Sequence, residues 1–180
     1  MAALPFDPTT LDPPGRAIFD AMVARRAAHG APFSGPYLAL MNHPQLCKRI
    51  EDLGFYLKFE GHLARDVYQF VVLSVARATG AQFEWDDHVA HARTAGVPEA
   101  VVATLAHDGP AGHFPAPYAL AAQVLASTLP WHDIPPAVQA AAIAAYSLEG
   151  FIEIVVLSGF YQMFSAVNQG FDIHHGEGKG

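Results

Sequence analysis

The sequence has too few cysteines and too few basic residues for several common functional classes. It contains one cysteine, Cys47, so neither an intrachain disulfide nor a paired-cysteine redox site can form. Residues 97–180 hold one basic side chain, Lys179, and seven acidic ones. We therefore expect no nucleic-acid partner, because that function needs a basic face. In a chain of net charge −7, an anionic ligand must find its cationic partners in the first half, at Arg65, Arg77 or Arg93.

Long hydrophobic runs are also missing. The most apolar segment, residues 152–164, is interrupted by Glu153 and is shorter than the roughly 18–20 residues that span a bilayer. Residues 1–14 carry four prolines and two aspartates before the first basic residue, Arg16, unlike a signal peptide. We therefore expect a cytoplasmic protein with no membrane partner.

Alanine and helix-like spacing dominate what is present. At 180 residues and 52% hydrophobic composition, the chain suffices for one domain with a substantial core. No segment shows sustained alternation of apolar and polar residues, so we predict an all-α fold. We expect an extended arm over residues 1–14, a single helical domain over 15–173 and a flexible tail over 174–180. The predicted helices cover residues 15–29, 36–42, 44–58, 61–79, 82–94, 97–107, 117–128, 135–148 and 150–168.

One of these predicted helices concentrates ionisable side chains. Glu84, His88 and His91 follow one another at intervals of four and three residues, so they share a helix face. A carboxylate beside an imidazole can relay protons near neutral pH. A structural interpretation stays open, because a glutamate in the first turn also favours the helix dipole. The same three side chains could instead hold a metal ion.

The surrounding pattern resembles a known family. Glu84-Trp85-x-x-His88, followed by Ala92 and Ala95-Gly96-Val97, is similar to the central signature of the carboxymuconolactone decarboxylase-like family, which includes alkylhydroperoxidase D-type proteins. Outlying segments at residues 34–37, 43–44, 70–80, 157–161 and 168 extend the likeness to roughly residues 33–173. The resemblance implies a compact bundle of about seven to nine helices that assembles into homo-oligomers. It also implies sites near subunit contacts and a role in aromatic-compound catabolism.

Two departures from the family pattern restrict the chemistry. The peroxidase branch carries Cys-x-x-Cys and then a histidine; aligned on His88, its two cysteines fall on Ala81 and Glu84. The glutamate that this branch places 19 residues before the histidine is Gln69 here. Glutamine can position a group through hydrogen bonds but cannot accept a proton at working pH. The chain thus resembles a non-redox branch, and dithiol peroxidase activity is not expected.

Further side chains are candidates for substrate binding. By resemblance, Arg65 could hold a substrate carboxylate and Gln69 could orient it. Trp85 could wall a pocket and raise the pKa of Glu84 by desolvation, and Tyr161 could supply a hydroxyl group. Each has a structural alternative, namely a surface arginine, a core tryptophan or an aromatic side chain in the packing.

Three functions are compatible with these residues. The first is a cofactor-independent lyase with decarboxylase-type proton transfer on a small anionic or oxygenated organic molecule. In it Glu84 and His88 exchange protons and His91 assists. The second is a metal-dependent enzyme that uses the same three side chains. The third is a binding or assembly protein that has kept the fold and lost catalysis.

Overall fold

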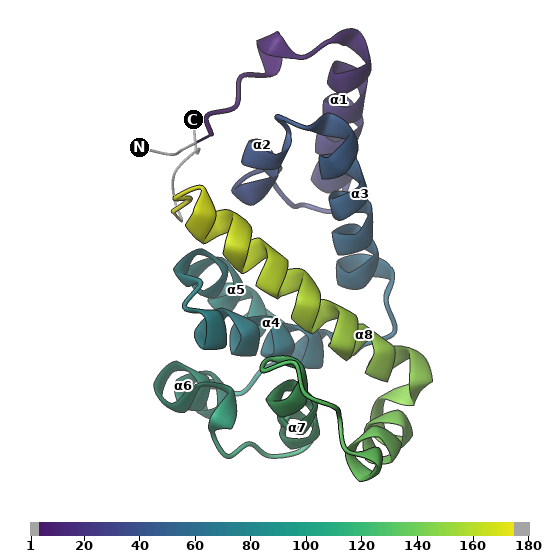
Figure 1. The fold of residues 1–180 in the computed structure, drawn as a ribbon, viewed down its shortest axis with the longest axis vertical. Helices are drawn as coiled ribbons and strands as arrows, with labels where there is room; N and C mark the ends of the chain where they lie inside the picture. The colour runs from purple at the N-terminus through teal and green to yellow at the C-terminus, as the bar shows by residue number, and fades with distance from the viewer. Residues whose placement is uncertain (1–3, 175–180) are drawn as a thin grey trace.

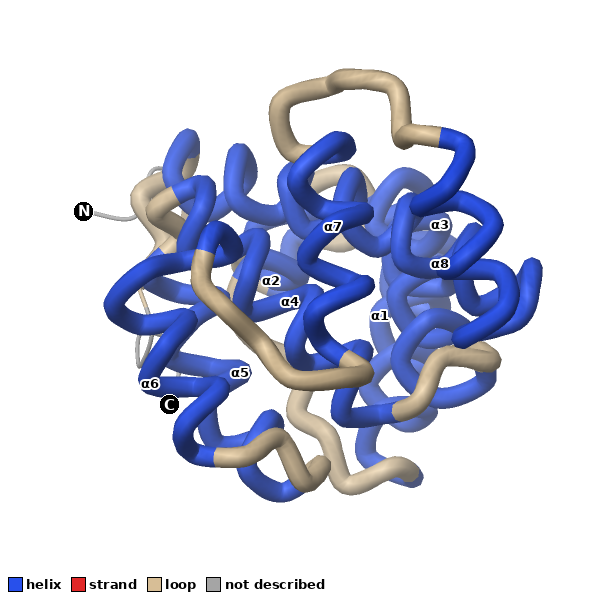
Figure 2. Tube along the Cα trace, turned by 90° about the horizontal axis from the view of Figure 1, so that it is seen from below, coloured by secondary structure: helices blue, strands red, loops and turns tan. Residues whose placement is uncertain are grey.

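The protein is entirely helical in the part of the chain that the structure describes. The computed structural model describes residues 4–174, which contain eight α-helices and no strand (Figure 2). The predicted all-α class is therefore confirmed. In chain order the helices are α1 (Pro13–Ala28), α2 (Pro36–Leu40), α3 (Pro44–Phe55), α4 (Arg65–Thr79), α5 (Gln82–Thr94), α6 (Glu99–Asp108), α7 (Tyr118–Thr128) and α8 (Pro136–Gly170).

Helix α4 forms the centre of the bundle. Its residues 67–76 are all buried, and α5, α7 and α8 pack around it (Figure 1). Four of these ten residues are valines, which form helices less readily than alanine does. The helix is therefore stabilised by tertiary burial, and it ends at Gly80, whose φ of 68° suits a residue without a side chain.

Helix α8 consists of two helical stretches separated by a kink at Ser147. This residue has φ 70° and ψ 170°, outside the helical region, and its hydroxyl oxygen accepts a hydrogen bond from the Gly150 backbone N–H at 3.2 Å. Ser147 therefore acts as an N-cap for the second stretch. The sequence-based break between residues 148 and 150 lies within three residues of the observed one.

The segment between α3 and α4 differs from the prediction of one helix through residue 58 and another starting at residue 61. After Phe55 the chain continues as the π-helical turn η2 (Tyr56–Glu60), and α4 begins only at Arg65. The cause is Glu153 of α8, whose carboxylate accepts hydrogen bonds from the backbone N–H groups of His62 and Leu63, each at 2.9 Å. A contact with Glu153, about 90 residues away, thus keeps this stretch from continuing as an α-helix and determines that α4 begins at Arg65.

The two chain ends were expected to be an arm and a tail. In the described part of the arm, η1 (Pro8–Thr10) forms a single turn, and the Phe6 ring packs on Phe19 of α1 with centroids 5.4 Å apart. Residues 1–3 of the predicted arm and 175–180 of the predicted tail lie outside the described residues.

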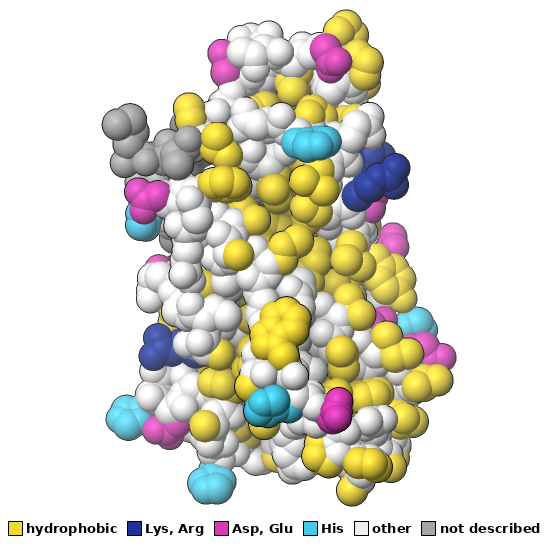
Figure 3. All heavy atoms as spheres, viewed as in Figure 1, with side chains coloured by type: hydrophobic (Ala, Val, Ile, Leu, Met, Phe, Trp, Pro, Cys, Tyr) yellow, Lys and Arg dark blue, Asp and Glu magenta, His cyan; other side chains and the backbone are white. Residues whose placement is uncertain are grey.

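Helix α8 also carries an exposed apolar face. By length and composition, α8 is the one helix among residues 4–174 that could cross a membrane, and 28% of its qualifying window is buried. Such a helix is weak evidence for membrane insertion, because core helices of soluble proteins pass the same test. The exposed face includes Leu148, Ile152 and Val156, spaced four residues apart. Apolar atoms are abundant along the course of α8 in Figure 3.

Candidate functional site

A cavity of about 320 Å³ lies among α1, η2, α4, α5 and α8. It is large enough for a small organic molecule. Its ionisable lining groups are Arg26, His29, Tyr37, Lys58, Arg65, Tyr68, Glu84, Asp87, His88, His91 and Tyr161. Glu84 and His88 are buried, whereas Arg65 and His91 are exposed, so the cavity opens to solvent at the side of the latter pair.

Glu84 projects from the first turn of α5 into this cavity. Burial raises the pKa of its carboxyl group from 4.5 to about 7, against the opposing effect of a 2.6 Å hydrogen bond donated by Asn168 Nδ2. The Asn168 Oδ1 atom is buried and has no hydrogen-bond partner among the described residues. Because an amide can donate to a carboxylate or accept from a carboxylic acid, Asn168 suits both protonation states of Glu84.

His88 lies one turn further along α5 and has both ring nitrogens engaged. Its Nδ1 is 2.8 Å from Gln69 Oε1, which can only accept, so Nδ1 carries the proton and Nε2 is the basic nitrogen. The Tyr161 hydroxyl donates to Nε2 at 3.2 Å and lies 2.9 Å from the hydroxyl of Tyr68. Burial lowers the pKa of His88 well below its usual value, so the imidazole is neutral.

The Glu84–His88 pair places a carboxyl group with a pKa of about 7 beside a neutral imidazole. Its closest atoms, Glu84 Oε2 and His88 Nε2, are 3.7 Å apart, too far for a hydrogen bond. Burial favours the uncharged form of each group, so an ion pair is not formed at neutral pH. Glu84 Oε2 is therefore available to a molecule in the cavity, whereas His88 Nε2 already accepts from the Tyr161 hydroxyl. A carboxyl group with a pKa near 7 can donate and recover a proton at physiological pH.

Positive charge lies close to this pair. Lys58 and Arg65 are both near enough to lower the pKa of His88. The Arg65 guanidinium lies 4.5 Å from the Tyr68 ring centroid and donates to the backbone carbonyl of Lys58. No carboxylate among the described residues forms an ion pair with Arg65, and the lining holds Arg26, Lys58 and Arg65 against the carboxyl groups of Glu84 and Asp87, so an anion that enters the cavity meets an excess of positive charge.

Comparison with known proteins adds one match. The sequence model of the carboxymuconolactone decarboxylase family matches residues 44–126. Residues 44–126 therefore carry the sequence pattern of this family, and the predicted family resemblance is confirmed over this segment. No curated protein and no solved structure matches the chain. The family segment runs from α3 to α7 and supplies Gln69, Glu84 and His88, whereas Tyr161 and Asn168 of α8 follow it.

The site residues predicted from the sequence fall into three groups in the structure. Glu84, His88, Arg65 and Tyr161 line the cavity together. His91 lines its exposed rim, with its ring centroid 5.9 Å from that of His88. Gln69, which is 1% exposed, lies behind His88 and orients it without lining the cavity.

Trp85, which we expected to form a wall of the pocket, lies elsewhere. It does not line the cavity, and the Arg77 guanidinium lies 5.2 Å from its ring centroid. Successive helical residues are rotated by about 100°, so the neighbour of an inward-facing glutamate faces elsewhere. Trp85 therefore does not wall the cavity beside Glu84.

Sequence reasoning missed two cationic residues of the cavity, Arg26 and Lys58. Arg26 follows the buried Met22 by four residues in α1, so an arginine on the buried face of an amphipathic helix was a detectable signal. Lys58 stood at the end of a predicted helix and had no such signal. Lys58 lies in η2 and lines the cavity.

The metal-site alternative gains no support from the donor geometry. Among residues 4–174, no group of three or more His, Cys, Asp or Glu side chains is placed to hold a metal ion. The single thiol, Cys47, is buried, and burial raises its pKa to about 12, so it is not a reactive thiolate.

Proposed function

We propose that this protein is a cofactor-independent lyase that decarboxylates a small organic acid in the cytoplasm. The observation that supports this most is the buried Glu84–His88 pair, with Glu84 poised at a pKa of about 7, in a cavity that also holds Lys58 and Arg65. A cavity of about 320 Å³ has the volume of about ten waters, which suits a small substrate. A chain of net charge −7 that gathers cations here favours an anionic ligand.

The proposed reaction needs one proton donor. Lys58 and Arg65 attract the substrate carboxylate, and the bond between this group and its neighbouring carbon breaks. Carbon dioxide leaves, and the electron pair stays on that carbon. Protonated Glu84 then delivers its proton to the carbon and becomes a carboxylate. His88 and the exposed His91 return a proton from water to Glu84, and the hydroxide left behind combines with the carbon dioxide to give bicarbonate.

The other two candidate functions are less well supported. A metal-dependent enzyme would need a third ligand beside Glu84 and His88, and His91 does not complete a metal-ligating group. In a binding or assembly protein that had lost catalysis, we would expect a closed cavity around His88. Here both ionisable groups line a cavity with exposed residues at its rim.

The proposal is tested by screening small aromatic and aliphatic carboxylic acids for release of carbon dioxide. For any acid that reacts, we expect Glu84→Gln and His88→Ala each to lower kcat by about 10²–10⁴-fold, because each removes a proton-transfer group. Asp86→Asn is the control, since Asp86 is an exposed neighbour on α5 that bonds Gln82 and does not line the cavity. Full activity in both variants, with folding intact by circular dichroism, would exclude this mechanism.

We also propose that the protein is a homo-oligomer that buries the apolar face of α8. The exposed Leu148, Ile152 and Val156 lie on one side of this helix, and such a stripe is unfavourable in water. Ile152→Glu should reduce the molar mass measured by size-exclusion chromatography with light scattering. Ala103→Glu, at an exposed position of α6, should leave the mass unchanged. A monomeric wild-type protein would contradict the proposal, and an unchanged mass of Ile152→Glu would exclude this face.

A further inference from the structure

Arg26 of α1 is a buried cation that lines the cavity and lies outside the family segment. Its relative exposure is 8%, and its guanidinium lies 4.2 Å from the ring centroid of Tyr37, another lining residue. A buried arginine costs free energy unless its charge and its N–H groups are satisfied. The partners of Arg26 therefore show how much of its binding capacity is already used.

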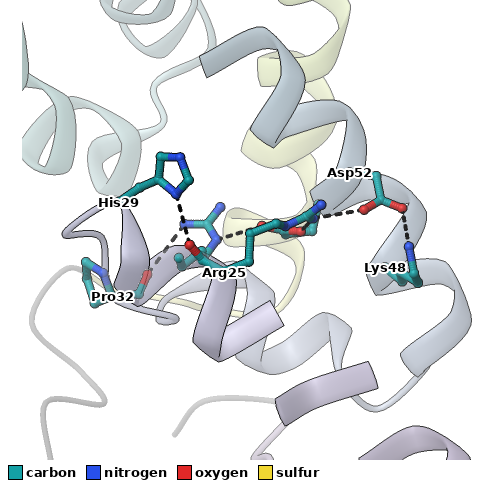
Figure 4. Close-up of polar contacts among 7 residues, drawn as sticks. Arg25, His29, Pro32, Lys48 and Asp52 are labelled. Atoms are coloured by element: carbon teal, nitrogen blue, oxygen red, sulfur yellow. Dashed lines mark hydrogen bonds and ion pairs between the residues drawn. The ribbon is translucent and has the colours of Figure 1, made fainter. Parts of the chain in front are cut away.

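A network of charged side chains that do not line the cavity holds Arg26 in place. Glu51 of α3, which is fully buried, accepts from Arg26 Nε at 3.1 Å and also pairs with Arg25. Arg25 also forms an ion pair with Asp52 at 2.8 Å, and Asp52 forms another with Lys48 at 2.6 Å (Figure 4). With three cations and two carboxylates, the network keeps a net charge of +1.

The Arg26 guanidinium has N–H donors that are not used by the described residues. A guanidinium has five N–H groups in a planar fork. Two of the nitrogens have acceptors, Nε with Glu51 and Nη1 with the Pro32 carbonyl at 3.4 Å. Nη2 has no acceptor among the described residues, and no cavity carboxylate forms an ion pair with Arg26. Planar N–H pairs of this kind match the two oxygens of a carboxylate.

Arg26 also lies near the proposed reacting groups. The charges of Arg26 and Glu84 both contribute to the pKa values of Tyr37 and Tyr68, so these two aromatic side chains lie within range of both groups. Phe160 and Phe164 of α8 line the same cavity. A carboxylate held at Arg26 would therefore rest against aromatic walls, with its remaining atoms in the space that Glu84 and His88 share.

We propose that Arg26 is the residue that binds and orients a ligand carboxylate in this cavity, with Glu51 as the positioning residue that fixes its guanidinium. The exposed Arg65 attracts the anion at the mouth, and Arg26 holds its carboxylate in one orientation against Tyr37. This inference rests on the proposed function only in taking the same cavity as the substrate site. It requires no turnover, because binding of an unreactive acid suffices.

The test is calorimetric titration of the full-length protein with benzoate and with benzamide, a neutral molecule of nearly the same shape. We expect saturable binding of benzoate and at least tenfold weaker binding of benzamide. Arg26→Gln should weaken benzoate binding at least tenfold, the loss expected for a charge-assisted hydrogen bond. Arg25→Gln is the matched control, because Arg25 pairs with the same Glu51 but does not line the cavity. It should change the affinity by less than about twofold, since it removes only a distant charge.

Two more variants separate binding from folding and from catalysis. Arg26→Gln combined with Glu51→Gln removes the buried pair together, so a folded double variant should show the same loss of benzoate binding. Glu84→Gln should keep benzoate binding even where it abolishes turnover, which distinguishes a failed mechanism from a failed binding site. Absence of benzoate binding to wild-type protein, unchanged binding in Arg26→Gln, or an equal loss in Arg25→Gln would each overturn the assignment to Arg26.

Discussion

Glu51→Ala is expected to lower the free energy of unfolding by about 3–5 kcal/mol, the usual cost of removing one partner of a buried ion pair. Glu51 is fully buried and pairs with both Arg25 and Arg26. Without it, Arg26 stays buried with an unbalanced charge, and the Nε group loses its acceptor. The replacement also leaves a void between α1 and α3, which adds to the loss.

Urea unfolding at pH 7 measures this effect, and Asp52→Ala provides the control. Asp52 belongs to the same network and pairs with Arg25 and Lys48, but its side chain is 39% exposed. Its removal should cost no more than about 1 kcal/mol, because exposed ion pairs contribute little. If both variants lost the same free energy of unfolding, burial would not be the reason for the large contribution of Glu51 to stability.

Residues on one helix were the predictable part of the site. The spacing of Glu84 and His88 places them on one face whatever the rest of the fold does, and both side chains line the cavity. The same geometry explains why Trp85, adjacent in sequence, does not line it. The order of the helices and their approximate limits followed from proline, glycine and apolar spacing, and even the kink of α8 was anticipated within three residues.

Contacts between distant segments were the part that the sequence left undetermined. Helix α4 starts at Arg65 because Glu153, about 90 residues away, takes the N–H groups that precede it. Hydrophobic periodicity carries no information on such a contact. Asn168 and Arg26 likewise join the site through packing of α8 and α1 against the family segment. A pattern read along one helix identifies a face, but the partners opposite that face depend on the tertiary structure.

The raised pKa of Glu84 also has a consequence for stability. A carboxyl group whose pKa rises on folding stabilises the protein below its unfolded-state pKa, and this contribution is lost as the pH rises through the folded-state value. For Glu84 the two values are 4.5 and about 7, so the loss falls mainly between pH 4.5 and 7. At 1.36 kcal/mol per pKa unit, the ionised form should be less stable by about 3 kcal/mol above pH 8.

Glu84→Gln should therefore stabilise the protein at pH 8.5 by about 3 kcal/mol, because glutamine stays neutral where glutamate must ionise. At pH 4.5 the two proteins should differ by less than about 1 kcal/mol, since glutamine replaces a mostly neutral acid and its amide oxygen can still accept from Asn168. Urea unfolding at both pH values measures the difference. Asp86→Asn, at an exposed position on the same helix, should show no such dependence. A stabilisation that is the same at both pH values would contradict a raised pKa for Glu84. We expect Glu84→Gln to be more stable than the wild-type protein only at alkaline pH, and also to lose turnover. That combination would mean that the buried carboxyl group of Glu84 serves catalysis at the expense of stability.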